Sequence, residues 1–241
     1  EKFVPRRACD QHMGRKVRER EAIARSFVAK AVYGFPHTRR LLESLKTTPS
    51  LRRICGFERV SSVPSESTFS RAFVEFAKSR LGERVHNAMV EDKLKSELIG
   101  HISRDATAIE GREKPKKKAA KPKAEPKKRG RSAKGEKREP KGPTRLERQL
   151  EQTAAEALDE LPAWCDVGTK KNSKGFSETW IGYKLHADVN DCGLPISVAL
   201  TAASVHDSQV AIPLMKMSST KVDYLYDVMD AAYDAGPIYE I

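Results

Sequence analysis

The chain has 241 residues and a formal net charge of +12, with 39% hydrophobic and 32% charged residues. This length is typical of one or two domains, and the hydrophobic content is sufficient for a buried core. No apolar run reaches the roughly 18 residues of a membrane span, and the first residues do not resemble a signal peptide. The four cysteines form no C-x-x-C pair, so we expect reduced thiols and no zinc site.

The N-terminal part, residues 1–97, is predicted to be an all-helical bundle. In "TTPSLRRICG", Thr48 has the chemistry of an N-cap and Pro49 suits the first helical turn, so a helix is expected to begin there. Apolar residues recur at the three- and four-residue spacing of buried helix faces. These positions are Ile23, Phe27, Ala31, Leu41, Leu42, Leu45, Phe69, Phe73, Phe76, Leu81, Val85 and Met89.

A strongly basic segment, residues 112–148, follows a predicted strand. It contains 17 Lys and Arg but only 5 Asp and Glu, so it accounts for the whole net charge of the chain. Its Lys, Pro, Ala and Gly residues offer almost nothing to bury, and we therefore predict that it is disordered. An amphipathic helix is expected to resume between about residues 146 and 161.

The remaining segments have the two-residue period of strands. "LIGHISRDATAIEG" predicts a first strand, and "TWIGYKLHADV", the turn "NDCG" and a partner segment predict a hairpin. "SVHDSQVAIPLMKM" predicts a helix capped by Asp207 or Ser208, which Pro213 should shorten or kink. "VDYLYDVMD" predicts a last strand. The apolar face of the hairpin is expected to comprise Ile181, Tyr183, Leu185, Ala187, Val189, Ile196, Val198 and Leu200.

Two aspartates occupy suggestive positions on these strands. In a mixed sheet of this order the first and last strands can be parallel neighbours, which would bring Asp105 and Asp230 together. Two like charges at close range favour bound cations, and carboxylate oxygens suit Mg²⁺ or Mn²⁺. Alternatively, Asp105 is a solvent-facing strand residue and Asp230 caps a following helix. Asp227 and Asp234 are competing candidates for the second acid.

A family resemblance rests on three blocks: "RDATAI", "WIGYKLHADVNDCGLPISVALTAASVHDS" and "VMDAAYDA". They resemble the catalytic domains of bacterial DDE transposases of the insertion-sequence-four and -five type. The segment "RRICGF … PSESTFSRAF" resembles the helical DNA-binding domain of the same proteins. The resemblance implies an α+β chain in which a helical domain, residues 1–97, precedes a ribonuclease H-like mixed α/β domain, residues 98–241, interrupted by the basic insertion.

The same resemblance implies a reaction and its residues. It implies metal-dependent phosphodiester cleavage and strand transfer in DNA transposition, with Asp105 and Asp230 as catalytic residues and ligands of two Mg²⁺ or Mn²⁺ ions. The third acid of the family, a Glu on a later helix, has no counterpart before Ile241. The chain is therefore expected to be a fragment truncated before that Glu, and inactive. The alternative is a non-catalytic remnant that binds or inhibits at transposon ends.

Further residues are assigned to DNA contact or to support of the site. His206 and Asp207 are candidates for the edge of the active site, although Asp207 also suits a helix cap. His186 is expected at the surface. Expected partners are the terminal repeats and target DNA, with a homodimer for the full-length protein, in the bacterial cytoplasm at the nucleoid and without a membrane. The residues assigned to DNA binding are Ser67, Arg71, Lys116, Lys117, Lys118, Lys127, Lys128, Arg129 and Arg131.

Overall fold

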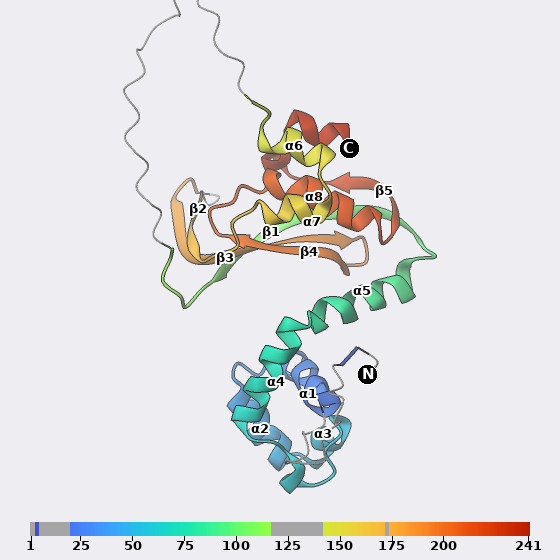
Figure 1. Cartoon of the computed structure of the whole chain (residues 1–241), viewed down its shortest axis with the longest axis vertical. Coiled ribbons are helices and arrows are strands. Elements are labelled where there is room, and N and C mark those ends of the chain that lie inside the picture. Colours follow the sequence, from blue (N-terminus) through green and yellow to red (C-terminus); the bar gives the residue numbers. More distant parts are fainter. Residues whose placement is uncertain (1–2, 5–19, 117–141, 172–173) are drawn as a thin grey trace, which may run out of the picture. The chain divides into compact units, whose positions relative to one another are not determined.

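The computed structural model describes residues 3–4, 20–116, 142–171 and 174–241 (Figure 1). The chain folds as two compact units, Glu1–Met89 and Val90–Ile241. The first is helical and the second is built around a mixed sheet, so the predicted α+β class is confirmed.

The helices of the first unit follow the sequence signals closely. α3 has Thr48 at its N-cap and Pro49 in its first turn, as predicted, and α2 buries all three of its leucines. Because the N–H groups of the first helical turn have no partner within the helix, proline at this position costs no hydrogen bond. The α-helices of this part of the chain are α1 (Arg20–Val32), α2 (Thr38–Thr47), α3 (Pro49–Ile54), α4 (Glu66–Lys78) and α5 (Leu81–Leu94).

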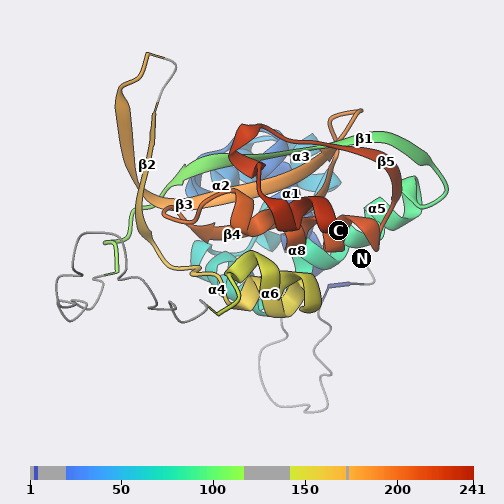
Figure 2. The ribbon, with the colours of Figure 1, turned by 90° about the horizontal axis from the view of Figure 1, so that it is seen from above.

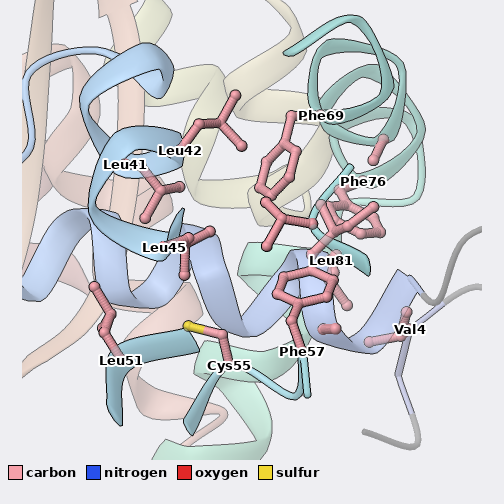
Figure 3. Close-up of a cluster of buried hydrophobic side chains, with 14 residues drawn as sticks. Val4, Leu41, Leu42, Leu45, Leu51, Cys55, Phe57, Phe69, Phe76 and Leu81 are labelled. Atoms are coloured by element: carbon pink, nitrogen blue, oxygen red, sulfur yellow. The ribbon is translucent and has the colours of Figure 1, made fainter. Parts of the chain in front are cut away.

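The core of the first unit is a cluster of leucine and phenylalanine side chains (Figure 3). Phe69 and Phe76 are buried in it, but Phe73 of the same helix is 59% exposed, so its predicted burial is wrong. Phe73 packs on Phe27, with 5.5 Å between the ring centroids, and lines an open cavity of about 430 Å³. Phe73 does lie next to the core, as the helical period indicates, but no described element covers its outer side.

In the described residues of the second unit, five strands form one sheet. β1 pairs antiparallel with β3 and parallel with β5, while β2 and β4 pair antiparallel with successive halves of β3. The predicted parallel pairing of the first and last strands is therefore confirmed. The strands are β1 (Leu98–Glu110), β2 (Asp166–Lys171), β3 (Ser177–Asn190), β4 (Pro195–Ala202) and β5 (Asp223–Val228).

Strand β3 changes partners at Gly182. Up to this residue it pairs with β2, and from it onward with β1. Gly182 has φ +152°, and a Cβ there would clash with the carbonyl oxygen of Ile109 on β1. Only glycine permits this close approach, so Gly182 fixes the point where the two strands meet. We call the paired segments 166–171 and 177–182 the β2–β3 ribbon; Figure 2 shows it extending away from the rest of the sheet.

Three helices pack on one another over the sheet: α6 (Arg145–Glu151), α7 (Ala154–Asp159) and α8 (Ser208–Ser219), of which α8 contacts β3 and β4. α6 begins at Arg145, inside the predicted insertion of residues 112–148, so the insertion ends earlier than predicted. The cause is a capping box in which Thr144 and Glu147 each bond the other's backbone N–H. Residues 117–141 of the predicted disordered segment lie outside the described residues.

Helix α8 continues through Pro213 to Ser219, so the predicted shortening is wrong. Proline has no N–H to donate to the carbonyl four residues earlier, which is that of Gln209. The buried side chain of Gln149 in α6 donates to this carbonyl over 2.9 Å instead. Lys216 in turn donates to backbone carbonyls at the C-terminal end of α6. The packing of α6 thus satisfies the group that proline would have left unpaired.

The sheet buries a different face from the one its apolar pattern predicted. Of the predicted face, Leu200 is 51% exposed, and Ile181 and Val198 are also exposed, whereas Ile196 is fully buried. The alternate positions of β3 and β4 are mostly polar and are the more buried ones. Helix α8 contacts both strands, and its packing explains the burial of this side. The buried polar residues of the two strands are His186, Asp188, Asn190, Ser197 and Thr201.

Candidate active site

The parallel pairing of β1 and β5 ends two residues before each candidate aspartate. Its last pair is Ser103 on β1 with Val228 on β5. Asp105 and Asp230 each follow two residues later, so the same register, if continued, would make them neighbours. Both side chains are exposed at this edge of the sheet.

Each carboxylate is oriented by one backbone hydrogen bond. Asp105 Oδ1 accepts from the N–H of Ala106 over 2.7 Å, and Asp230 Oδ1 accepts from the N–H of Ala232 over 2.9 Å. The second bond caps a short 3-10 helix (Ala231–Tyr233), so the alternative prediction of a capping role for Asp230 is met as well. Within the described residues, the second oxygen of each carboxylate accepts no hydrogen bond and is available to a ligand.

Asp227, the competing candidate on β5, belongs to a buried charge cluster. Arg104 donates to both oxygens of Asp188 over 2.7 and 2.8 Å, and its Nη2 lies 3.0 Å from Asp227 Oδ1. Ser218 donates a further bond to Asp188 over 2.6 Å. Burial alone would lower the pKa of Arg104, but the hydrogen bond and charge of Asp188, with Asp227, raise it. Asp227 is therefore ion-paired with Arg104. We call Arg104, Asp188 and Asp227 the buried charge cluster.

Asp234, the other competitor, is exposed beyond this edge. Its carboxylate accepts a hydrogen bond from the Tyr239 hydroxyl over 3.2 Å. It has no place in the register that brings Asp105 and Asp230 together.

Tyr233 lies close enough to Asp105 and Asp230 for their charges to act on its hydroxyl. Its ring is buried, and among the described residues its hydroxyl has no hydrogen-bond partner. Burial is the main cause that raises the pKa of this phenol, followed by the negative charge of Asp207, with smaller contributions from Asp105 and Asp230. The hydroxyl is thus a neutral group within range of three carboxylates.

Asp207 and His206, predicted to support the site, have different surroundings. Asp207 occupies the N-cap position of α8 but makes no capping bond; it accepts from Lys184 Nζ over 2.9 Å. His206 is exposed, and its Nδ1 is 2.8 Å from Ser208 Oγ. Asp207 is therefore tied to β3 by an ion pair, whereas His206 contacts the start of α8.

His186 is fully buried, which corrects its predicted surface position. Its Nε2 is 2.9 Å from Thr201 Oγ1, and its Nδ1 is 3.8 Å from Asp207 Oδ1. Burial lowers the pKa of His186 to about 4, against the attraction of Asp207. The ring is therefore neutral at physiological pH.

Sequence reasoning did not single out Arg104, Asp188 or Tyr233. A usable signal exists in β3, where Lys184, His186, Asp188 and Asn190 occupy every second position. Polar residues with the strand period, alternating with apolar ones, indicate two different faces but not which one is buried.

The predicted DNA contacts are distributed over the chain. Ser67 and Arg71 lie exposed on α4, where Arg71 Nε donates to the Ser67 carbonyl over 3.2 Å. Lys116 Nζ lies 4.2 Å from the centroid of the Trp164 ring. The other predicted contacts lie outside the described residues: Lys117, Lys118, Lys127, Lys128, Arg129 and Arg131.

The acidic pair has the donor chemistry of a magnesium site. Mg²⁺ is commonly held by one or two carboxylates, with water and substrate phosphate oxygens completing its shell. Asp105 and Asp230 offer two such carboxylates. Across the residues that the structure describes, no group of three or more His, Cys, Asp or Glu side chains is arranged to hold a metal ion. The pair thus fits an ion whose remaining ligands come from water and substrate.

Two parts of the chain match known protein families. Residues 98–240 match the family described as "Transposase DDE domain", and residues 1–75 match "Transposase domain (DUF772)". The first match covers more than half of the chain, so the chain belongs to the DDE transposase family. Membership implies DNA as a partner and the use of divalent metal ions. Neither the curated proteins nor the solved structures gave a match.

One further feature concerns membranes. Among the described helices, none is both long and apolar enough to cross a bilayer.

Proposed function

We propose that this chain is the DNA transposase of a bacterial insertion sequence of the four or five type, in which Asp105 and Asp230 bind Mg²⁺ or Mn²⁺ for phosphodiester cleavage and strand transfer. The observation that supports the proposal is the β1–β5 register, which ends two residues before each exposed carboxylate and, if continued, would make them neighbours. The strand order also supports a ribonuclease H-like fold for residues 98–241, since an antiparallel trio is followed by a parallel strand.

The metal ions would supply Lewis-acid stabilisation of the charge that develops at phosphorus. The protein supplies position. The backbone N–H groups of Ala106 and Ala232 fix one oxygen of each aspartate and leave the other directed to a ligand. Behind them, Arg104 joins β3 to β5 across β1, so the strands that carry the aspartates are held in one register.

We further propose that residues 1–97 bind DNA, with Ser67 and Arg71 contacting phosphates from the exposed side of α4. Lys116 and the basic residues up to Arg131 would add contacts that are independent of sequence. The DNA would be the terminal repeats and the target, engaged by a homodimer.

Iron-directed cleavage of the polypeptide tests the metal site without relying on turnover. Fe²⁺ replaces Mg²⁺, and with ascorbate and peroxide it generates radicals that cut the backbone near the bound ion. We expect cuts near residues 105 and 230 that excess Mg²⁺ suppresses. Asp105→Asn or Asp230→Asn should abolish the cuts, because each removes one of two carboxylate ligands.

Asp223→Asn is the matched control. Asp223 is an exposed aspartate at the opposite end of β5, so its replacement removes the same charge from the same strand. Unchanged cuts in both Asp105→Asn and Asp230→Asn, or cuts confined to other segments, would overturn the assignment.

A further inference from the structure

The β2–β3 ribbon stands apart from the layered part of its unit. In the described residues, positions 177–181 of β3 pair with β2 alone, and β1 joins only at Gly182. Trp180 lies over Gly168 of the opposite strand and fixes the base of the ribbon. Beyond this base the described side chains are exposed, and Figure 2 shows the ribbon projecting from the sheet. An isolated pair of strands is marginally stable in water, so a contacting surface would stabilise it.

The projecting end has the chemistry of a polyanion contact. Lys170, Lys171 and Lys174 are exposed there, against one acidic residue, Glu178. Thr169 and Thr179 face each other across the two strands of the ribbon, so this part of its surface is polar. Phe176, 69% exposed, adds an aromatic ring near the tip. Lysines neutralise phosphates, and an exposed ring can pack on sugars or bases, so this combination favours nucleic acid over an apolar protein surface.

The dimensions of the ribbon match a groove of duplex DNA. The major groove of B-form DNA, about 12 Å wide, admits a two-stranded ribbon. Along β3, Ala187 is the partner of Asp105, and Ser177 is the partner of Lys171. These ten residues of strand span up to about 33 Å, and one turn of B-form DNA rises about 34 Å.

We propose that the β2–β3 ribbon is a DNA-contacting arm that enters a groove about one helical turn from the phosphate held at Asp105 and Asp230. The proposal rests on the function proposed above, because it takes DNA as the partner of this unit. It assigns Lys170 and Lys171 to phosphate contacts and Phe176 to the groove interior. It also assigns Gly182 a role, since this residue sets where the arm leaves the sheet.

The salt dependence of DNA binding tests the lysines. Affinity of the whole chain for a duplex of defined sequence is measured across a salt series for the wild type and for Lys170→Ala/Lys171→Ala. Each phosphate contact contributes about 0.9 to the slope of log affinity against log salt, so the double variant should lose up to about 1.8.

A second double variant, Lys93→Ala/Lys95→Ala, is the matched control. It removes the same charge from the same unit, but these lysines, at the C-terminal end of α5 and just after it, pair with Asp92 and Glu91 at 3.1 Å. Its slope should equal that of the wild type. Equal slopes for the ribbon and control variants would overturn the proposal.

The position of the arm on DNA is tested by mapping a crosslink and a cleavage site on the same duplex. A photo-crosslinking benzoylphenylalanine replaces Phe176, and Fe²⁺ bound at the acidic pair cuts the DNA beside it. The crosslinked and cut nucleotides should be about 9–10 base pairs apart, given about 3.4 Å per pair. In the wild type, bound DNA should also protect the peptide bonds after Lys170 and Lys171 from trypsin. A crosslink adjacent to the cut, or the absence of protection, would contradict the arm.

The outcomes separate this inference from the proposed function. If the wild-type chain does not bind DNA, the proposed function fails and the arm with it. If DNA binds and iron cuts it, but the ribbon lysines and Phe176 make no difference, only the arm is wrong. If the ribbon variants change the sedimentation coefficient but not DNA affinity, the ribbon contacts a second copy of the chain, which also overturns the proposal.

Discussion

Two groups of charges lie on or next to strands β1 and β5 of the second unit and have opposite surroundings. In the buried charge cluster, the side chains of Arg104 and Asp188 are fully buried, that of Asp227 is 18% exposed, and the two acids share one guanidinium. The exposed pair, Asp105 and Asp230, has no cation at hydrogen-bond distance in the described residues. Arg104 and Asp105 are consecutive, so the alternation of a strand is enough to send one side chain into the core and the next to the edge.

The contrast shows how one short segment serves stability and chemistry at once. Buried charges must be compensated, since an unpaired one costs several kcal/mol. Exposed carboxylates need no partner from the protein, and two of them side by side create a local negative potential that attracts a divalent ion. The comparison therefore predicts that mutations at adjacent positions differ sharply in their effects.

The largest effect is expected for Arg104→Met. It leaves two acids without their cation in the core, and we expect the free energy of unfolding to fall by about 3–5 kcal/mol, measured by urea denaturation. Arg112→Met, at an exposed position shortly after β1, should change stability by about 0.5 kcal/mol or less. A loss below about 1 kcal/mol for Arg104→Met would show that the cluster is not compensated as described.

A smaller, pH-dependent effect is expected for His186, next to Asp207. Its pKa is about 4 when folded and about 6.5 when unfolded, so the unfolded chain binds the proton first as pH falls. The stabilisation by the neutral ring is complete above pH 6.5 and is lost down to pH 4, by roughly 3 kcal/mol in total. His186→Gln should remove this part of the acid sensitivity in urea titrations, whereas His206→Gln, at the surface, should not. Identical pH profiles for His186→Gln and the wild type would count against burial of an uncharged ring.

The smallest effect on stability is expected at the exposed pair. Asp105→Asn and Asp230→Asn should change the free energy of unfolding by about 0.5 kcal/mol or less in the absence of metal, because both side chains are exposed. Adding Mg²⁺ should raise the melting temperature of the wild type but not of these variants, since only the native pair binds the ion. A large loss of stability without metal would instead make the pair structural, like the buried charge cluster.

Much of the fold could be read from the sequence because its signals are local. Thr48 and Pro49 mark a helix start wherever they occur in such a context, and the order of strands follows from chain order and connection lengths. The parallel pairing of β1 and β5 was predictable in this way.

Other features depended on packing partners that are distant in the chain. Periodicity divides β3 into two faces, but only the position of α8 decides that the polar face of His186 and Asp188 is the buried one. The continuation of α8 through Pro213 depends on Gln149, which is far away in sequence. The raised pKa of Tyr233 depends on its burial and on the carboxylates of Asp207, Asp105 and Asp230, and no local sequence pattern indicates this environment.

The two ends of the long basic segment are both fastened within residues 90–241. On one side, Glu113 accepts from the Tyr183 hydroxyl over 2.8 Å, and the N–H of Lys116 donates to the Cys165 carbonyl over 3.0 Å. On the other, Gln149 and Lys216 fasten α6 to α8. Both sets of anchors lie outside residues 117–141. Residues 117–141 are therefore a suitable insertion site for protein engineering. A fluorescent reporter or an affinity tag inserted there is expected to leave the sheet, with Asp105 and Asp230, intact.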